Sequence, residues 1–142
     1  MTFESIRAEL DADADDGDVR AGDAAIGVMV RILEAVADLF EASPDIKHAL
    51  FLEDKGGVSL VCTSDEIGRQ KRRVLPEGAT VTGHTTRRIN FRVAPDGSRA
   101  SVVVVGETSQ THPLRIDDSL PTYARKWVDW LTPVPGTCCL VF

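Results

Sequence analysis

The strongest chemical signal in this 142-residue chain is a row of polar side chains at every second position of residues 80–93. The even positions are all polar, and they include His84, Arg88, Asn90 and Arg92. Side chains two residues apart on a strand project from one face at intervals of about 7 Å. Such a row could bind a phosphate, a carboxylate or an acidic protein surface through charge-assisted hydrogen bonds.

Two further arginines precede this row, and they complete the predicted set of anion- or partner-binding residues. That set is Arg72, Arg73, His84, Arg88, Asn90 and Arg92. Residues 69–99 hold eight bases and two acids, a net charge of +6, whereas residues 1–45 hold three bases and twelve acids, a net charge of −9. An ordinary solvent-facing side of an antiparallel sheet has the same alternation, so this alternative stays open.

A nucleic-acid or anionic-ligand module using the basic strand face of residues 72–92 is the first alternative function. The whole chain has a net charge of −6, which does not favour nucleic acid. Modules that bind single strands also interleave stacking aromatic residues with bases. Only Phe91 is close in sequence, and it falls on the opposite face of the strand.

Metal and catalytic motifs are absent from the sequence. The three histidines, His48, His84 and His112, do not stand at paired-ligand spacing with one another or with Cys62. We find no nucleophile elbow, glycine-rich phosphate loop or HExxH helix. We therefore predict no catalytic residue, no metal site and no cofactor. An enzyme whose carboxylates meet only in the folded chain is the second alternative.

Two amphipathic segments are predicted to be helices that support this surface. Residues 23–42 have an apolar stripe wide enough for cover on two sides, with Asp23 as the predicted N-cap. Residues 120–131 place Tyr123 on one face with two tryptophans. We hypothesise that some of these residues form an interface with a partner or within a homodimer. The predicted interface residues are Val28, Ile32, Leu39, Trp127 and Trp130.

The remaining patterns predict an α+β fold with an antiparallel sheet of five to six strands and an N-terminal and a C-terminal helix on one face. Residues 48–53 and 58–63 read as a hairpin, and the four valines within 100–106 indicate a strand buried on both faces. We predict a flexible acidic segment over 1–22, of which 1–10 could form a short helix. Residues 23–142 are predicted to form a single domain.

The sequences at both ends of the chain are used to predict the cellular compartment. Cys139 opens a C-terminal sequence that spells a prenylation box beside Cys138, but residues 132–137 contain no base, so we expect a short strand instead of a lipid anchor. The acidic N-terminus lacks the features of a signal peptide, and no apolar stretch is long enough to span a bilayer. Arginine outnumbers lysine twelve to four, which favours a prokaryotic source. We predict a cytoplasmic protein.

Our first functional hypothesis is a non-catalytic domain that binds another protein. Size, acidity and the mixture of helix and sheet fit adaptors, secretion chaperones, antitoxins and immunity proteins. No motif ties any residue to one of these classes, so the partner stays unidentified.

Overall fold

The computed structural model describes residues 2–13, 20–53, 55–63, 87–106 and 108–131. Within these ranges the helices are α1 (Phe3–Asp13), α2 (Asp23–Ala42) and α3 (Leu120–Leu131). The strands are β1 (Lys47–Leu52), β2 (Val58–Thr63), β3 (Arg88–Val93), β4 (Ala100–Val105) and β5 (Ser109–Leu114).

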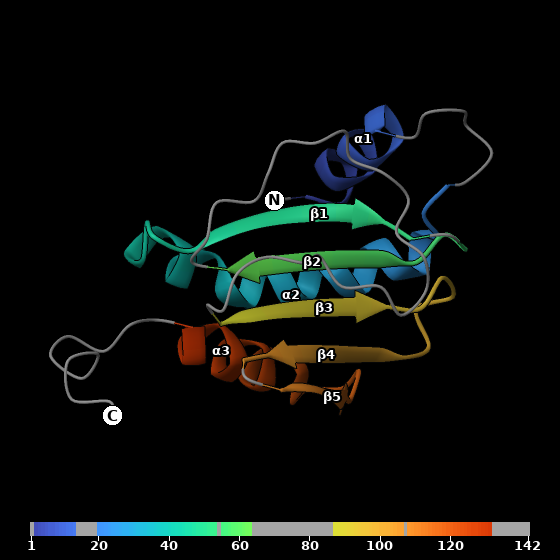
Figure 1. Ribbon diagram of the computed structural model, residues 1–142. Coiled ribbons are helices and arrows are strands. Elements are labelled where there is room, and N and C mark those ends of the chain that lie inside the picture. The colour runs from blue at the N-terminus through green and yellow to red at the C-terminus, as the bar shows by residue number, and fades with distance from the viewer. Residues whose placement is uncertain (1, 14–19, 54, 64–86, 107, 132–142) are drawn as a thin grey trace, which may run out of the picture.

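The five strands form one antiparallel sheet in which each strand pairs with the next along the chain, in the order β1-β2-β3-β4-β5. Helices α2 and α3 lie behind the sheet in Figure 1, and α1 lies beside β1 at one edge. The predicted α+β class is confirmed, with an antiparallel sheet of five strands and with α2 and α3, the predicted N-terminal and C-terminal helices, on one face.

Glycines shape two of the tight turns between strands. Gly56 between β1 and β2 has a φ of 90°, and Gly97 between β3 and β4 has a φ of 71°. Side chains with a Cβ atom adopt this region only with strain, whereas glycine adopts it freely. The turns fix the registers Leu52↔Val58 and Val93↔Ala100, and the first of these confirms the predicted hairpin of residues 48–53 and 58–63.

One face of the sheet, the inner face, packs on the helices and carries the hydrophobic core. Successive residues of a strand point to opposite faces, so alternate residues of every strand enter this core. The fully buried members of β2 and β3 include Leu60, Cys62, Ile89 and Phe91, each 0% exposed. The valines of β4 behave as predicted, since Val102 (0%) faces the core while Val103 (6%) is buried on the opposite face.

Helix α2 owes its wide apolar stripe to neighbours within the same chain. It contacts α1, α3, β2 and β3, so more than one side of the helix is covered without a second subunit. Val28 and Ile32 are 8% and 0% exposed and belong to the core. The prediction that these two residues form an interface is therefore corrected, because their side chains are not available to a partner.

The start of α2 also differs from the sequence-based expectation. Gly22 is the N-cap residue and makes no side-chain cap hydrogen bond, so the prediction of Asp23 as the cap is wrong. Asp23 instead stands in the first turn and forms an ion pair with Arg7 of α1. A carboxylate in the first turn still interacts favourably with the positive end of the helix dipole.

Helix α1 is part of the packed structure. Ile6 and Leu10 are each 1% exposed and belong to the core, and the Arg7 guanidinium donates a hydrogen bond to the carbonyl of Ala21 over 2.6 Å. For residues 3–13 this corrects the expectation of a flexible segment. The predicted short helix at the N-terminus is found there, anchored by two aliphatic side chains.

His48, at the start of β1, is expected to make stability depend on pH. The residue is exposed as a whole, but one face of its ring stacks on Phe40 with centroids 4.2 Å apart. This burial lowers the pKa of His48 below its ordinary value of 6.5, and the charge of Glu9 opposes part of the shift. Below pH 6.5 the unfolded chain therefore binds more protons than the folded chain.

The stability due to the neutral imidazole is complete above the unfolded pKa and is lost as pH falls through the lower folded pKa. We expect His48→Gln to flatten the decline in the free energy of unfolding between about pH 7 and pH 5, a window above the ordinary range of carboxylates. Urea titrations at each pH measure this slope. An unchanged slope would show that His48 does not cause the decline.

Candidate functional site

The second face of the sheet, the outer face, points away from α2 and α3 and carries the polar row predicted from the sequence. The side chains of this face come from all five strands, and the pairing of each strand with the next places them side by side. They include Phe51, Ser59, Val61, Thr63, Arg88, Asn90, Arg92, Ser101, Val103 and Thr111. The face is mixed, because buried apolar side chains separate the polar ones.

Three of the predicted binding residues share this face, but they are not a solvent-exposed row. Arg88 is 5% exposed and Asn90 is 1% exposed, and Arg92 is half-buried. Alternation shows which side chains share a face, and it does not show whether water reaches them. Arg72, Arg73 and His84, the other members of the predicted set, lie outside the described residues.

Arg92 forms a bidentate ion pair with Glu53, which follows β1. The Arg92 Nε and Nη2 atoms donate to the Glu53 carboxylate over 2.8 and 3.0 Å, and the Ser59 hydroxyl also donates to it. The side chains of Arg92 and Glu53 are only 14% and 10% exposed. The prediction that Arg92 offers its charge to an external anion is corrected, because Glu53 already provides that anion.

Asn90 has a different environment at the centre of the face. It pairs in register with Val61 of β2 and Val103 of β4, and neither its Nδ2 nor its Oδ1 atom has a hydrogen-bond partner. An unsatisfied buried amide destabilises a fold by about 1–3 kcal/mol. Such a group therefore calls for an explanation in terms of function or ligand.

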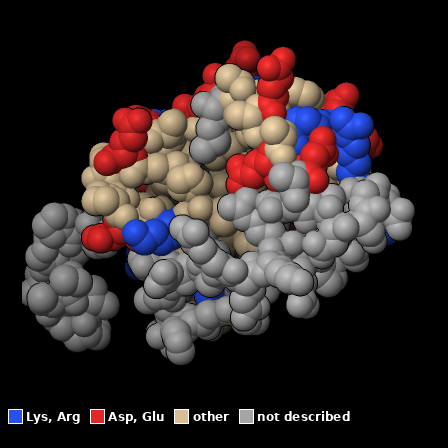
Figure 2. Space-filling view, turned by 90° about the horizontal axis from the view of Figure 1, so that it is seen from above, with Lys and Arg blue, Asp and Glu red and all other residues tan. Residues whose placement is uncertain are grey.

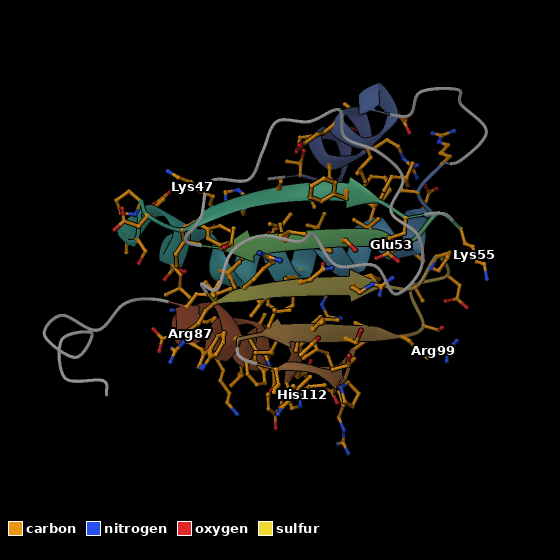
Figure 3. All side chains as sticks on the ribbon, in the orientation of Figure 1. Lys47, Glu53, Lys55, Arg87, Arg99 and His112 are labelled. Atoms are coloured by element: carbon orange, nitrogen blue, oxygen red, sulfur yellow. The ribbon has the colours of Figure 1, made fainter. Side chains whose placement is uncertain are left out.

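A broad groove of about 1060 Å³ lies over the outer face of β3, β4 and β5, at the end where Arg92 stands. Three exposed bases line it, Lys55, Arg99 and Arg115, and Asp117 is the acid that faces them besides the paired Glu53. Figure 3 places Lys55 and Arg99 at the same end of the sheet, on the turns that follow β1 and β3. The groove thus gathers positive charge from three separate segments of the chain.

The sequence patterns did not identify these three bases as a group. Lys55 and Arg99 stand in turns, and Arg115 follows β5, which the sequence reading did not expect. The floor of the groove includes Ser101 and Thr111, whose outward direction follows from the β4–β5 register. Only knowledge of β5 would have brought these residues together in advance.

The opposite side of the molecule has the opposite charge. Figure 2, which looks onto α1 and the neighbouring edge of the sheet, shows acidic side chains spread over this side. The exposed or half-buried acids of α1 and α2 are Glu4, Glu9, Asp11, Asp23, Glu34, Asp38 and Glu41. The described part of the acidic region predicted from the sequence thus lies on this side, whereas four of the eight bases counted in residues 69–99 (Arg69, Lys71, Arg72 and Arg73) lie outside the described residues.

The predicted aromatic interface on α3 is only partly available. Trp127 stacks on His112 of β5 at 4.9 Å and contacts the edge of Trp130 at 6.5 Å, and both tryptophans are half-buried. The Arg87 guanidinium lies 4.5 Å from the centroid of the Trp130 ring and donates to its carbonyl. Tyr123, which the sequence places on the same face as the two tryptophans, is 45% exposed. These contacts make Trp127 an anchor between α3 and β5, and they join Trp130 to Arg87, the residue before β3.

Leu39 is half-buried on α2, so it keeps some surface for a partner. The homodimer stays a prediction.

Within the described ranges, no three His, Cys, Asp or Glu side chains are placed to hold a metal ion. Cys62 is fully buried, and burial raises the pKa of its thiol, which keeps it protonated and unreactive. Among the described helices, none is both long and apolar enough to cross a membrane.

The groove is a region of the described structure where open space, exposed charge and hydrogen-bonding side chains coincide. Comparisons of the chain with protein-family models, with curated proteins and with solved structures find no match.

Proposed function

We propose that this chain is a non-catalytic protein-binding domain of the prokaryotic cytoplasm whose groove takes an extended acidic segment of another protein. The observation that carries the proposal is the convergence of Lys55, Arg99 and Arg115 on one groove of about 1060 Å³. Because Arg92 and Glu53 neutralise each other, the three exposed bases dominate the charge that a ligand meets.

The dimensions of the groove favour a peptide over a small metabolite. Small-molecule sites are typically enclosed cavities of about 300–1000 Å³ lined mainly by apolar side chains. The volume of this groove slightly exceeds that range, and charged and hydroxyl side chains are prominent among those that line it. Ser101 and Thr111 offer hydrogen bonds between the bases, as an extended main chain requires.

Charge also favours an acidic protein over nucleic acid. The chain has a net charge of −6, and its acidic side would repel a long polyanion that extended beyond the groove. A short acidic segment contacts the basic groove alone. Electrostatic complementarity of this kind gives fast association and partner selectivity more than affinity.

A peptide titration tests the proposal. A fluorescent glutamate-rich peptide is titrated at about 0.15 M salt, where the screening length is about 8 Å. Replacing Lys55, Arg99 and Arg115 together with glutamine is expected to weaken binding by at least about tenfold, a loss of about 1.4 kcal/mol. Fluorescence anisotropy gives the dissociation constants, and circular dichroism verifies that the variant is folded.

The matched control changes the net charge equally but away from the groove. Lys47, Arg125 and Lys126 are exposed and do not line the groove, and their joint replacement with glutamine should leave affinity within about twofold. An equal loss in both variants would reduce the interaction to net charge and overturn the proposal. Tighter binding of an oligonucleotide of equal length, with a steep salt dependence, would favour the nucleic-acid alternative.

A further inference from the structure

The unpaired donor and acceptor of the Asn90 side chain indicate which chemical groups a ligand would need, and the groove alone does not. It is 1% exposed at the centre of the outer face, and both its donor and its acceptor lack a partner. A leucine of similar volume would avoid about 1–3 kcal/mol of desolvation at this position. The polar group therefore has no stabilising role that the structure reveals.

The chemistry of the orphaned amide restricts what could bind it. A carboxylate or a phosphate only accepts hydrogen bonds, so it would satisfy Nδ2 and leave Oδ1 unpaired. A main-chain peptide group offers an N–H donor and a C=O acceptor, which match the two halves of the asparagine amide. The missing partner is therefore best supplied by the main chain of an extended peptide.

Arg88 stands two residues from Asn90 on the same face. It is 5% exposed, and its side chain forms no ion pair or hydrogen bond with another described residue. A guanidinium that is removed from water is stable when a carboxylate pairs with it. Thr63, its partner in the β2–β3 register, is also buried. An acidic side chain is the natural complement of this position.

We infer that the outer face of β3 extends the groove as a peptide track, in which Asn90 binds the main chain of the ligand and Arg88 pairs with one of its acidic side chains. This inference rests on the proposed function, since it describes the same acidic segment after it leaves the groove. Arg92 stands at the groove end of the same row. It stands four positions along β3 from Arg88, a distance of about 13 Å.

Burial of the amide has a kinetic consequence. Because only 1% of Asn90 is exposed, the atoms that cover its side chain must move before a peptide reaches it. Association at this step should be slower than the range of about 10⁵–10⁷ M⁻¹s⁻¹ that is typical of preformed surfaces. The groove, which is open, binds its part of the segment first.

The experiment combines a protein variant with a modified peptide. In Asn90→Leu the melting temperature should rise, because an unsatisfied buried amide is removed, while affinity for the glutamate-rich peptide should fall about tenfold. Peptides that carry a single backbone N-methyl group at successive positions lose one N–H each. One position should weaken binding to the parent protein and have no further effect on Asn90→Leu.

A parallel series tests Arg88. Single Glu→Gln changes along the peptide should reveal one position whose effect disappears in Arg88→Met, as expected for two groups in contact. If Asn90→Leu does not fold, Asn90→Ser, which has a smaller side chain, replaces it in the N-methyl experiment. Circular dichroism verifies each fold.

The outcomes separate the two levels of the proposal. If the parent protein binds no acidic peptide, or if the groove variant binds as well as the parent, the proposed function fails. If binding depends on the groove but Asn90→Leu keeps full affinity and no N-methyl position couples to it, the peptide track is refuted and the proposed function stands.

Discussion

Replacing Arg92 with methionine is expected to destabilise the protein by about 3 kcal/mol, because the substitution leaves the Glu53 carboxylate buried without its charge partner. The pair is bidentate, and both side chains are at most 14% exposed, so water replaces little of the lost interaction. Glu53 would keep only the Ser59 hydroxyl as a donor among the contacts that the structure defines. Urea unfolding followed by circular dichroism measures the change.

The double variant Glu53→Leu/Arg92→Met is the control for this experiment. Buried ion pairs can often be replaced by apolar side chains at little cost, whereas removing one partner is strongly destabilising. The double variant should therefore recover most of the stability that the single variant loses. If it is as unstable as Arg92→Met, the loss arises from packing of the arginine stem and not from an uncompensated charge.

Phe91→Ala is expected to lower the free energy of unfolding by about 3–5 kcal/mol, since it removes a large buried side chain and leaves a cavity. Phe91 is 0% exposed and lies on the inner face of β3, in the middle strand of the sheet. It pairs in register with Leu60 and Val102, both of which belong to the same core. A loss of this size would be a large share of the free energy of unfolding of a typical domain, which is about 5–15 kcal/mol.

Tyr123→Ala is the matched aromatic control. Tyr123 is 45% exposed on α3, so its removal should change stability by no more than about 0.5 kcal/mol. Both variants are compared by the same urea titration. Equal losses at the two positions would contradict the assignment of the inner face of β3 as the centre of the core.

Periodicity predicted the elements that bury apolar surface. The stripe of residues 23–42 gave α2 with the bounds that the structure shows, and the valine run gave β4. Strand β5 was not anticipated, because its sequence SQTHPL is polar and contains a proline. Proline is tolerated there because β5 is an edge strand and pairs with β4 alone within the described sheet.

The candidate site was less predictable than the fold because its contacts join distant parts of the chain. Alternation placed Arg88, Asn90 and Arg92 on one face, which the register confirms. It could not reveal that Glu53, 39 residues earlier, pairs with Arg92, or that Arg88 and Asn90 are buried. Local pattern determines the direction of a side chain, whereas its neighbours depend on the order of the strands.

The strand order also divides the described structure into two parts. The turns within β1–β2 and within β3–β4–β5 are short, whereas 24 residues separate Thr63 from Arg88, the paired ends of β2 and β3. One part contains α1, α2 and the first hairpin, and the other contains β3, β4, β5 and α3. The two parts meet along the β2–β3 pairing and where α2 packs on α3.

This arrangement is the one that fragment complementation requires. A chain cut between residues 63 and 88 would leave two fragments whose internal strand pairings are all local, and each would expose the apolar surface that the other buries. The connection between β2 and β3 is thus a suitable place to divide the chain into two fragments whose reassembly reports that they have met. Reassembly would restore the pairing of β2 with β3, in which Val61 lies opposite Asn90.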